Sequence, residues 1–271
     1  MEIAVLGAGA LGSLFGGYLS ADHEVVLVGH EGPHLEAIES SGLTIETPDE
    51  IEVHRDPDTT TDHAAVAGVD LLLIAVKSYD TEQAVEDVAP YVDEMDVLTL
   101  QNGLGNVQTI AKATSRDSII AGTTTNGAYI DEPGVCVHSG WGETTIGRYW
   151  APNDDVVETV VEDLSAVDLP TKTTGDPKQA IWSKVLVNVG INAATALARV
   201  PNGCMITDPA GERLLERSVG EAKRVAAAEG LSFDEDPVAR TKSVAEATAT
   251  NRSSMLQDVE AGSRTEIIAL N

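Results

Sequence analysis

The sequence predicts an α/β protein of two domains: an N-terminal Rossmann-type domain with a doubly wound sheet, and a C-terminal all-α domain. Short apolar runs alternate with helical stretches across residues 2–121, and a glycine-rich turn directly follows the first run. Residues 171–177 form a polar segment that contains Gly175 and Pro177, and the apolar spacing after it is helical. We therefore expect a dinucleotide-binding domain over residues 1–174 and a helical domain over residues 175–271.

The first strand and the turn after it indicate nucleotide binding. Residues 2–6 form a short apolar run typical of a buried parallel strand, and residues 13–20 indicate a helix. Between them lies a G-x-G-x-x-G turn, which has most weight where it joins a strand to a helix. Its residues are the cofactor-binding candidates Gly7, Ala8, Gly9, Ala10, Leu11 and Gly12. The alternative is a glycine-rich turn that serves packing alone.

Each glycine of this turn has a separate physical role in the dinucleotide interpretation. Gly7 permits the tight turn, Gly9 lets the backbone approach a pyrophosphate, and Gly12 lets the helix pack closely on the strand. The N-terminus of the following helix offers free N–H groups and a partial positive charge to the phosphates.

The end of the second strand bears on the choice between NADPH and NADH. Residues 24–28 are predicted to form this strand, and His30 and Glu31 follow it. A carboxylate at this place binds a ribose 2′-OH, whereas a cationic group accommodates a 2′-phosphate. Because the last strand positions are not acidic, the pattern favours NADPH, with His30 as a phosphate contact. NADH stays open, because Glu31 could bind a ribose or simply begin the next helix.

Further strands and helices complete the predicted parallel sheet. Strands are expected at 70–76, 97–100 and 118–121, and helices at 81–91 and 106–114. Residues 123–148 alternate between polar and apolar and contain turn glycines, so we expect antiparallel additions to this sheet, followed by a helix at 154–164.

Polar residues directly follow two of these strands. Lys77 follows one strand, and Asn102 follows the next. Ligands of such sheets bind outside the carboxyl ends of the strands, so both residues are site candidates. The alternative is that they lie in loops that cap the following helices.

The most informative segment of the second domain is a polar stripe in an apolar helix. Lys184, Asn188 and Asn192 are spaced four residues apart, which places their side chains on one helical face. Their neighbours are almost all apolar, so the helix should be buried. A buried lysine and two buried amides are costly unless they are satisfied. They either satisfy one another and the nearby backbone or face a polar ligand.

The chain is strongly acidic. It has 17 Lys and Arg against 44 Asp and Glu, a net charge of −27. Such an excess repels nucleic acid and anionic lipid, so we expect no nucleic acid and no membrane as partner. A solvated acidic surface is the simplest interpretation, and a high-salt cytoplasm is one origin of it. This halophilic hypothesis predicts loss of the fold at low salt; a melting temperature that is equal in dilute buffer and in molar KCl would refute it.

Other features favour a cytoplasmic protein. Cys136 and Cys204 lie far apart and near no metal-ligand pattern, which suits a reducing compartment. Met1 leads straight into a strand, and no apolar run approaches the roughly 20 residues that span a bilayer. We expect no metal site and interpret five histidines as surface or loop residues: His23, His34, His54, His63 and His138. The oligomeric state is not specified; a homodimer is compatible with the sequence.

The C-terminal segment adds two further polar candidates. Residues 253–268 indicate a helix that is interrupted or weakened near Gly262. At about 100° per residue, Ser254 and Glu266 lie about 120° apart on a straight helix. Both would therefore reach one site only from its two edges, or past a bend near Gly262. The chain ends at Asn271 inside an apolar helical pattern, and we expect the natural protein to continue.

Several short segments, in order over nearly the whole chain, resemble the ketopantoate reductase (2-dehydropantoate 2-reductase) family. The matching segments are Gly7–Gly12, Val76–Lys77, Gln101–Gly105, Gly122–Thr125, Trp182–Lys184 with Asn188 and Asn192, Pro201–Gly203, Ser253–Asp258 and Thr265–Ile267. The segments that carry Lys184 and Ser254 are more specific than the glycine motif. The resemblance implies reduction of 2-dehydropantoate to pantoate by NADPH, in the route to pantothenate and coenzyme A.

The resemblance also assigns roles to residues. Lys184 matches the family's catalytic lysine. Its substrate-binding positions are matched by Asn102, Asn188, Asn192, Asn202 and Ser254. Cofactor contacts are matched by Lys77, by Asn102 and by the backbone of Ala128, and Glu266 matches a glutamate near the cofactor and the lysine. The family often has an arginine where this chain has His30.

Two other functions remain as alternatives. A β-hydroxyacid dehydrogenase-like enzyme also pairs a Rossmann domain with a helical domain that carries Lys and Asn four residues apart; oxidation of 3-hydroxy acids without ketopantoate reduction would favour it. A non-catalytic NADP(H)-sensing protein would bind NADP(H) tightly but turn over no 2-oxo acid. For Asn202, the competing interpretation is an ordinary Pro-Asn-Gly turn.

Overall fold

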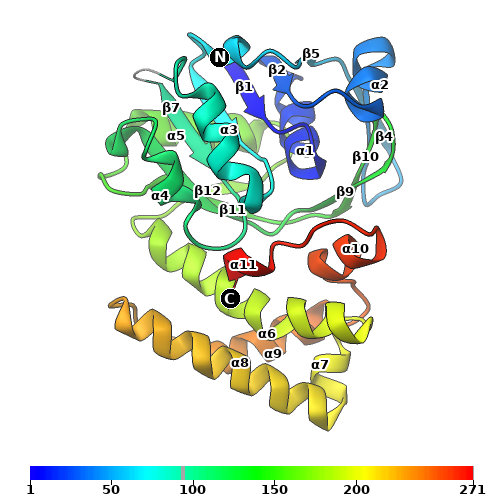
Figure 1. Ribbon diagram of the computed structural model, residues 1–271, viewed down its shortest axis with the longest axis vertical. Helices are drawn as coiled ribbons and strands as arrows, with labels where there is room; N and C mark the ends of the chain where they lie inside the picture. The colour runs from blue at the N-terminus through cyan, green and yellow to red at the C-terminus, as the bar shows by residue number, and fades with distance from the viewer. Residues whose placement is uncertain (93–94, 271) are drawn as a thin grey trace. The chain divides into compact units, whose positions relative to one another are not determined.

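The structure, a computed structural model, describes residues 1–92 and 95–270 and divides into two compact units (Figure 1). Unit 1 comprises Met1–Gln101 and Gly105–Lys178, and unit 2 comprises Asn102–Leu104 and the chain from Gln179 onward. The chain therefore passes from unit 1 to unit 2 inside a helix, a few residues after the boundary expected from the sequence. The short segment Asn102–Leu104 belongs to unit 2, which local sequence does not indicate.

Unit 1 is built on an eight-stranded sheet with the order β12-β11-β8-β7-β6-β1-β2-β5. Its strands are β1 (Glu2–Leu6), β2 (Glu24–Val28), β5 (Asp58–Thr60), β6 (Leu71–Ile74), β7 (Asp96–Thr99), β8 (Ile119–Thr124), β11 (Thr144–Arg148) and β12 (Thr171–Thr173). All neighbouring strands pair in parallel except β8 and β11, which are antiparallel. The predicted doubly wound sheet is confirmed. Its central strands are apolar runs because both faces are buried.

A second sheet of four strands has the order β4-β3-β10-β9. Its strands are β3 (Leu43–Glu46), β4 (Glu52–Arg55), β9 (Gly127–Glu132) and β10 (Val135–Gly140). The expectation that residues 123–148 add antiparallel strands to the main sheet holds for β11 and is wrong for β9 and β10. These two form a hairpin, but β10 pairs in parallel with β3, from Val135 opposite Thr44 to Val137 opposite Glu46, so a separate sheet results.

Helix α1 (Ala10–Leu19) packs against strands of both sheets. Its small residues permit this close packing. A Cβ at Gly16 would lie 2.5 Å from Leu27 of the main sheet, and one at Gly17 would lie 2.7 Å from Leu43 of the second sheet. The other helices of unit 1 are α2 (Pro33–Ser41), α3 (Thr81–Val88), α4 (Asn106–Ile110) and α5 (Asp155–Ala166). The close approaches at Gly16 and Gly17 hold the second half of α1 against both sheets.

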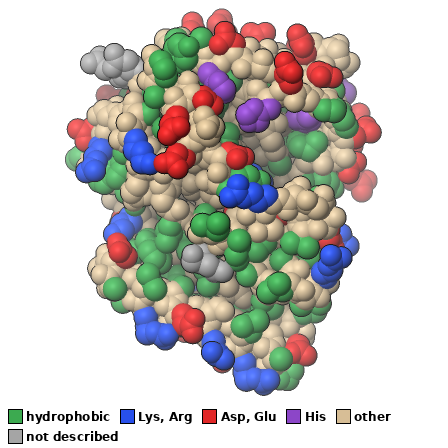
Figure 2. All heavy atoms as spheres, in the orientation of Figure 1, with side chains coloured by type: hydrophobic (Ala, Val, Ile, Leu, Met, Phe, Trp, Pro, Cys, Tyr) green, Lys and Arg blue, Asp and Glu red, His purple; other side chains and the backbone are tan. Residues whose placement is uncertain are grey.

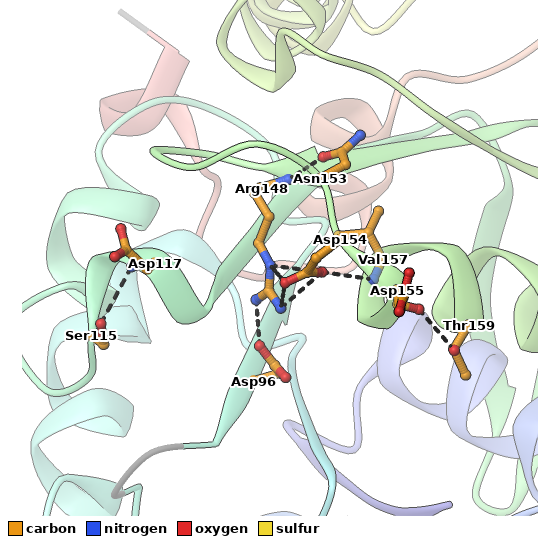
Figure 3. A network of polar contacts seen from close by, with 9 residues as sticks. All are labelled: Asp96, Ser115, Asp117, Arg148, Asn153, Asp154, Asp155, Val157 and Thr159. Carbon is orange, nitrogen blue, oxygen red and sulfur yellow. Dashed lines mark hydrogen bonds and ion pairs between the residues drawn. The ribbon is translucent and has the colours of Figure 1, made fainter.

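The buried Arg148, the last residue of β11, forms ion pairs with Asp96 and Asp154 (Figure 3). Its guanidinium donates to Asp96 at the start of β7 and forms paired contacts with Asp154, with Nη2 2.8 Å from Oδ2. Asp154 also caps α5 by accepting the backbone N–H of Val157. Desolvation would raise the pKa of the Asp154 carboxyl, but the hydrogen bonds from Arg148 and Val157 outweigh it and hold this pKa below its usual value. The cluster lies at the amino end of β7, so it stabilises the sheet edge opposite the carboxyl ends.

We predict that Arg148→Met destabilises the protein by about 2–3 kcal/mol, because Asp96 and Asp154 lose their partner and Asp96 is partly buried. Chemical unfolding measures this difference. The control is Arg116→Met, which removes an exposed guanidinium that lies 5.1 Å from the ring of Trp150 and should cost much less. Equal unfolding free energies for the two variants would show that the Asp96–Arg148–Asp154 cluster contributes little.

Unit 2 is helical, as predicted. Its helices are α6 (Pro177–Ala198), α7 (Cys204–Thr207), α8 (Pro209–Ala228), α9 (Pro237–Ala247), α10 (Ser254–Glu260) and α11 (Ile267–Leu270). The interruption predicted near Gly262 is confirmed, because α10 ends at Glu260 and Gly262 has a φ of +69°. By length and composition α6 could cross a membrane, contrary to the expectation that no segment would, but half of its most apolar stretch is buried in the protein. A buried core helix meets the same criterion, so this is weak evidence for a membrane span.

Candidate active site

The glycine turn follows β1 directly and has the geometry that each glycine position requires. Gly7 has a φ of +108°, and a Cβ there would lie 2.7 Å from the backbone nitrogen of Val76. A Cβ at Gly12 would lie 1.9 Å from the carbonyl oxygen of Gly7. At Gly9 a Cβ would meet nothing within 4 Å. Glycine is therefore needed at positions 7 and 12 for packing. At Gly9 the space beside the backbone is open, and this is where a dinucleotide is expected to approach the backbone.

The N-terminus of α1 is suited to an anion. Gly9 is its N-cap, no side chain caps the helix, and the first turn contains no acidic residue. The orphan N–H groups of a helix N-terminus and the positive end of the helix dipole attract phosphate groups. The turn and this helix end therefore fit a dinucleotide pyrophosphate.

The turn lies at the switch point of the sheet, where β1 has β2 on one side and β6 on the other. Lys77 follows β6 and is exposed. The amide nitrogen of Gln101, just beyond β7, donates to the carbonyl oxygen of Val76 at 2.6 Å and to Thr81 at 2.8 Å, and its amide oxygen accepts from Thr99. Gln101 thus fixes the segment that packs on Gly7. Sequence reasoning did not single out Gln101, although it precedes Asn102 in the motif.

Two more cofactor candidates lie at other strands of unit 1. His30 follows β2 and is exposed, as is Glu31, before α2 begins at Pro33. Ala128 lies on β9, opposite His138 of β10, and packs against the core of unit 1. The exposure of His30 and Glu31 leaves either free to meet a ribose or its phosphate.

In unit 2, α6 carries the predicted polar stripe. Lys184 and Asn188 are partly buried and Asn192 is buried. Desolvation lowers the pKa of Lys184 to about 8, and the negative charge of Glu266 partly opposes this by raising it. A lysine with this pKa is protonated at neutral pH but releases its proton readily, which suits a general acid.

Two segments distant in sequence join α6 in unit 2. Glu266 is buried directly before α11, and its charge acts on Lys184. The segment that begins at Asn102 is held on α11, because the Leu104 N–H donates to the carbonyl oxygen of Ala269 at 2.9 Å. Asn102 therefore belongs to the same unit as Lys184 and Glu266.

Asn202 and Ser254 are linked to each other and to α6 through neighbouring residues. The backbone N–H of Asn202 donates to the carbonyl of Asn251, shortly before α10. Ser253, the N-cap of α10, lies with its Oγ 2.8 Å from that of Thr195 on α6. Ser254 is exposed. Asn202 is buried, and its amide nitrogen donates to Thr248 at 3.0 Å. The structure thus groups the predicted substrate residues in unit 2.

The interpretation of all five histidines as surface or loop residues is wrong for His138 and His34. His138 is fully buried, with Nε2 3.0 Å from Asn126 and Nδ1 3.2 Å from the Tyr18 hydroxyl. Its ring also packs edge-on to Trp141. His34 is partly buried and hydrogen-bonded through both nitrogens. Within residues 1–92 and 95–270, no three His, Cys, Asp or Glu side chains are grouped to hold a metal.

A Rossmann-type sheet with a glycine turn that fits a pyrophosphate, together with a helical unit that carries a lysine of lowered pKa, is typical of a dinucleotide-dependent oxidoreductase. Comparison with known families makes this more specific. The sequence model described as "Ketopantoate reductase PanE/ApbA" matches residues 3–150, and its C-terminal counterpart matches residues 176–271. The chain belongs to the ketopantoate reductase family.

Individual relatives cover the whole chain. It is 48% identical to the 2-dehydropantoate 2-reductase of Halobacterium salinarum, over 100% of this chain and 90% of that protein. A crystal structure of a PanE/ApbA family ketopantoate reductase from Ralstonia eutropha is 31% identical, with a TM-score of 0.90, and covers 100% of this chain and 89% of that one. A ternary structure of D-mandelate dehydrogenase with NADH and anilino(oxo)acetate is 25% identical, with a TM-score of 0.92 and the same coverage.

Proposed function

We propose that this chain reduces 2-dehydropantoate to pantoate with a reduced nicotinamide dinucleotide, a step toward pantothenate and coenzyme A. The observation that carries the proposal is the 48% identity, over the full chain, to a 2-dehydropantoate 2-reductase. The test is a spectrophotometric assay of 2-dehydropantoate with NADPH and with NADH side by side, in high salt. Substrate-dependent oxidation of the cofactor is expected; oxidation of neither cofactor above the enzyme-free rate would refute the proposal.

The cofactor would be held mainly by unit 1. The backbone of Gly7, Ala8, Gly9, Ala10, Leu11 and Gly12 would bind the pyrophosphate, and Lys77, Asn102, the backbone of Ala128 and Glu266 would supply further contacts. The reduced nicotinamide, when bound, supplies the hydride. The open space at Gly9 and the uncapped start of α1 support this assignment.

Unit 2 would bind the substrate and supply the proton. Negative charge develops on the ketone oxygen as its carbon accepts hydride, and the Lys184 ammonium would stabilise that charge and deliver the proton. Glu266 keeps Lys184 protonated to higher pH than burial alone would allow. The neutral side chains of Asn102, Asn188, Asn192, Asn202 and Ser254 would hold the substrate without competing as acids.

We propose NADPH as the preferred cofactor, with the exposed His30 as a contact to the 2′-phosphate. We predict that His30→Ala raises the KM for NADPH about three- to tenfold, because a solvent-exposed contact to a phosphate is weaker than a buried one. The KM for NADH, which lacks the phosphate, should not change and is the internal control. Equal effects on both cofactors would remove His30 from the phosphate site.

A second candidate function is the reduction of other 2-oxo acids. It is favoured by the likeness to D-mandelate dehydrogenase, whose ternary structure contains NADH and anilino(oxo)acetate. A panel that compares kcat/KM for 2-dehydropantoate and for aryl and branched-chain 2-oxo acids separates the two. A larger kcat/KM for an aryl 2-oxo acid would make this candidate the principal function.

We further propose that the protein works in a cytoplasm of high salt concentration. For its oligomeric state, we propose a homodimer as the assembly to test first. Acidic side chains occur at many places on the face of unit 1 visible in Figure 2, in line with the net charge of −27. We predict that the melting temperature rises by at least several degrees from dilute buffer to molar KCl, because salt screens the self-repulsion of these charges. Differential scanning calorimetry over a KCl series measures this; a flat series would contradict the halophilic interpretation.

A further inference from the structure

His34, in the first turn of α2, is hydrogen-bonded through both ring nitrogens. Its Nδ1 accepts the backbone N–H of Gly134, in the turn between β9 and β10, at 3.0 Å. Its Nε2 lies 2.9 Å from the hydroxyl oxygen of Ser13 on α1. Because Nδ1 is an acceptor, a neutral ring carries its proton on Nε2, so Nε2 donates to Ser13.

Ser13 extends this chain of hydrogen bonds to the glycine turn. It is fully buried, and its hydroxyl donates to the carbonyl oxygen of Ala8 at 3.4 Å. Its backbone N–H also donates to the carbonyl of Gly9 at 2.8 Å. A continuous path therefore runs from Gly134 through His34 and Ser13 to the turn that is expected to bind the pyrophosphate.

We propose that His34 is a positioning residue for dinucleotide binding, which acts through Ser13 to hold the Ala8 peptide of the glycine turn in its binding conformation. The inference rests on the proposed function only in requiring that this turn binds a dinucleotide. His34 itself touches no reacting atom, so its contribution is to affinity for the cofactor and not to the chemical step.

Only the neutral form of His34 can make both hydrogen bonds. A proton on Nδ1 would place an N–H against the N–H of Gly134. Burial lowers the pKa of His34, which keeps the ring neutral near neutral pH. The other titratable side chains on the surrounding elements are Glu36 and Glu39 of α2, Tyr18 of α1, Asp58 of β5, Tyr129, Asp131 and Glu132 of β9, and Cys136 and His138 of β10. In the part of the chain that the structure describes, none of these forms an ion pair with the His34 ring, so no carboxylate stabilises its cation.

Two substitutions of His34 separate its two hydrogen bonds. In His34→Asn the amide oxygen can take the place of Nδ1 and keep the bond from Gly134, whereas in His34→Gln the amide nitrogen can take the place of Nε2 and keep the bond to Ser13. We expect His34→Asn to raise the Kd for NADH about tenfold and His34→Gln to raise it less than about threefold. Kd is measured by fluorescence titration, and the melting temperature of each variant is measured alongside.

Ser13→Ala tests the next link and has a matched control on the same helix. It should raise the Kd for NADH about as much as His34→Asn. The control is Ser20→Ala, at the other end of α1, where the hydroxyl donates to the carbonyl of Gly17 at 2.8 Å. Ser20→Ala should leave the Kd unchanged.

The pH dependence of binding distinguishes positioning by a neutral ring from general support of the fold. The wild-type affinity for NADH should fall on acidification below the ordinary histidine pKa of 6.5, as His34 gains a proton, and it should be flat in His34→Gln. NADH is the probe because it lacks the 2′-phosphate that the proposed function assigns to His30.

The outcomes for this inference and for the proposed function are separable. Wild-type binding of NADH with a His34→Asn Kd within twofold of wild type overturns the inference alone. So does an acid limb that persists in His34→Gln, or a loss of affinity that merely follows the melting temperature in all variants. A wild-type protein that binds neither NADH nor NADPH overturns the proposed function and this inference with it.

Discussion

Replacement of Lys184 by alanine is expected to lower kcat for 2-dehydropantoate reduction by about 100-fold or more, which is the range of a lost general acid. Alanine can neither stabilise the developing alkoxide nor supply its proton. The fold should persist, because burial of the lysine ammonium is itself unfavourable, as its lowered pKa shows. Steady-state kinetics and thermal unfolding measured on the same preparation check both statements.

Lys223→Ala is the control for the loss of a lysine from unit 2. Lys223 is exposed and paired with Asp236, with Nζ 2.9 Å from Oδ1, and its removal should leave kcat unchanged. A Lys184→Ala variant within about threefold of wild type would exclude Lys184 as the general acid.

The pKa of Lys184 also sets the pH dependence of the reduction. Reduction needs the protonated amine, so kcat should fall as the pH rises through about 8. Glu266 raises this pKa, so Glu266→Gln should move the alkaline limb to lower pH. The stability of the fold changes with pH in the opposite direction to kcat. The folded protein binds the Lys184 proton less tightly than the unfolded chain does. The free energy of unfolding should therefore rise as the pH goes from about 8 to the ordinary lysine pKa of about 10.4.

Replacement of Gly9 by alanine is expected to weaken dinucleotide binding about 30-fold or more, while the melting temperature stays near that of wild type. The backbone of Gly9 has a φ of −87°, which alanine adopts freely, and the new methyl group meets no protein atom within 4 Å. It would instead occupy the space expected for the pyrophosphate and disrupt its charge-assisted hydrogen bonds, each worth about 1.5–3 kcal/mol. Equilibrium titration with NADPH measures the effect.

Alanine substitutions at two other glycines serve as comparisons for Gly9→Ala. Gly220→Ala, in α8, also meets open space and should leave cofactor affinity unchanged. Gly12→Ala would place a methyl group 1.9 Å from the carbonyl oxygen of Gly7, so it should lower the melting temperature as well as affinity. Unimpaired NADPH binding by Gly9→Ala would move the dinucleotide away from this turn.

The parts of the fold that can be predicted from the sequence are those determined by interactions within a short segment. The run Ile3–Leu6 is buried on both faces of a parallel sheet, so it is continuously apolar, and the glycines after it leave little choice of turn. The four-residue spacing of Lys184, Asn188 and Asn192 likewise follows from the helical repeat of α6.

The second sheet could not be predicted in this way. Strands β3 and β4 have only four residues each, and β3 pairs with β10, whose first residue, Val135, lies opposite Thr44. Nothing in either segment specifies a partner so distant in the chain. The alternation over residues 123–148 predicted antiparallel strands, and β9 and β10 do pair in this way, but the sheet that they join is packed against α1 and is not specified locally.

The burial of two polar residues was also not predicted from the sequence. Gln101 and His138 have no local mark in the sequence, because the partners that make their burial tolerable come from other elements: Val76 and Thr81 for Gln101, and Tyr18 and Asn126 for His138. A histidine among turn residues resembles a surface residue until these partners are known.

The three residues Asn102–Leu104 have a consequence for how the two units could be separated or recombined. They belong to unit 2 although the chain on both sides of them belongs to unit 1, and the Leu104 N–H is bonded to Ala269 near the other end of the chain. A fragment that begins at residue 175 would therefore lack part of the helical unit and expose the main-chain acceptor of Ala269. Chimeras between members of the family should exchange the 102–104 segment together with the C-terminal helices, because a single crossover near residue 178 would join segments that have not evolved together.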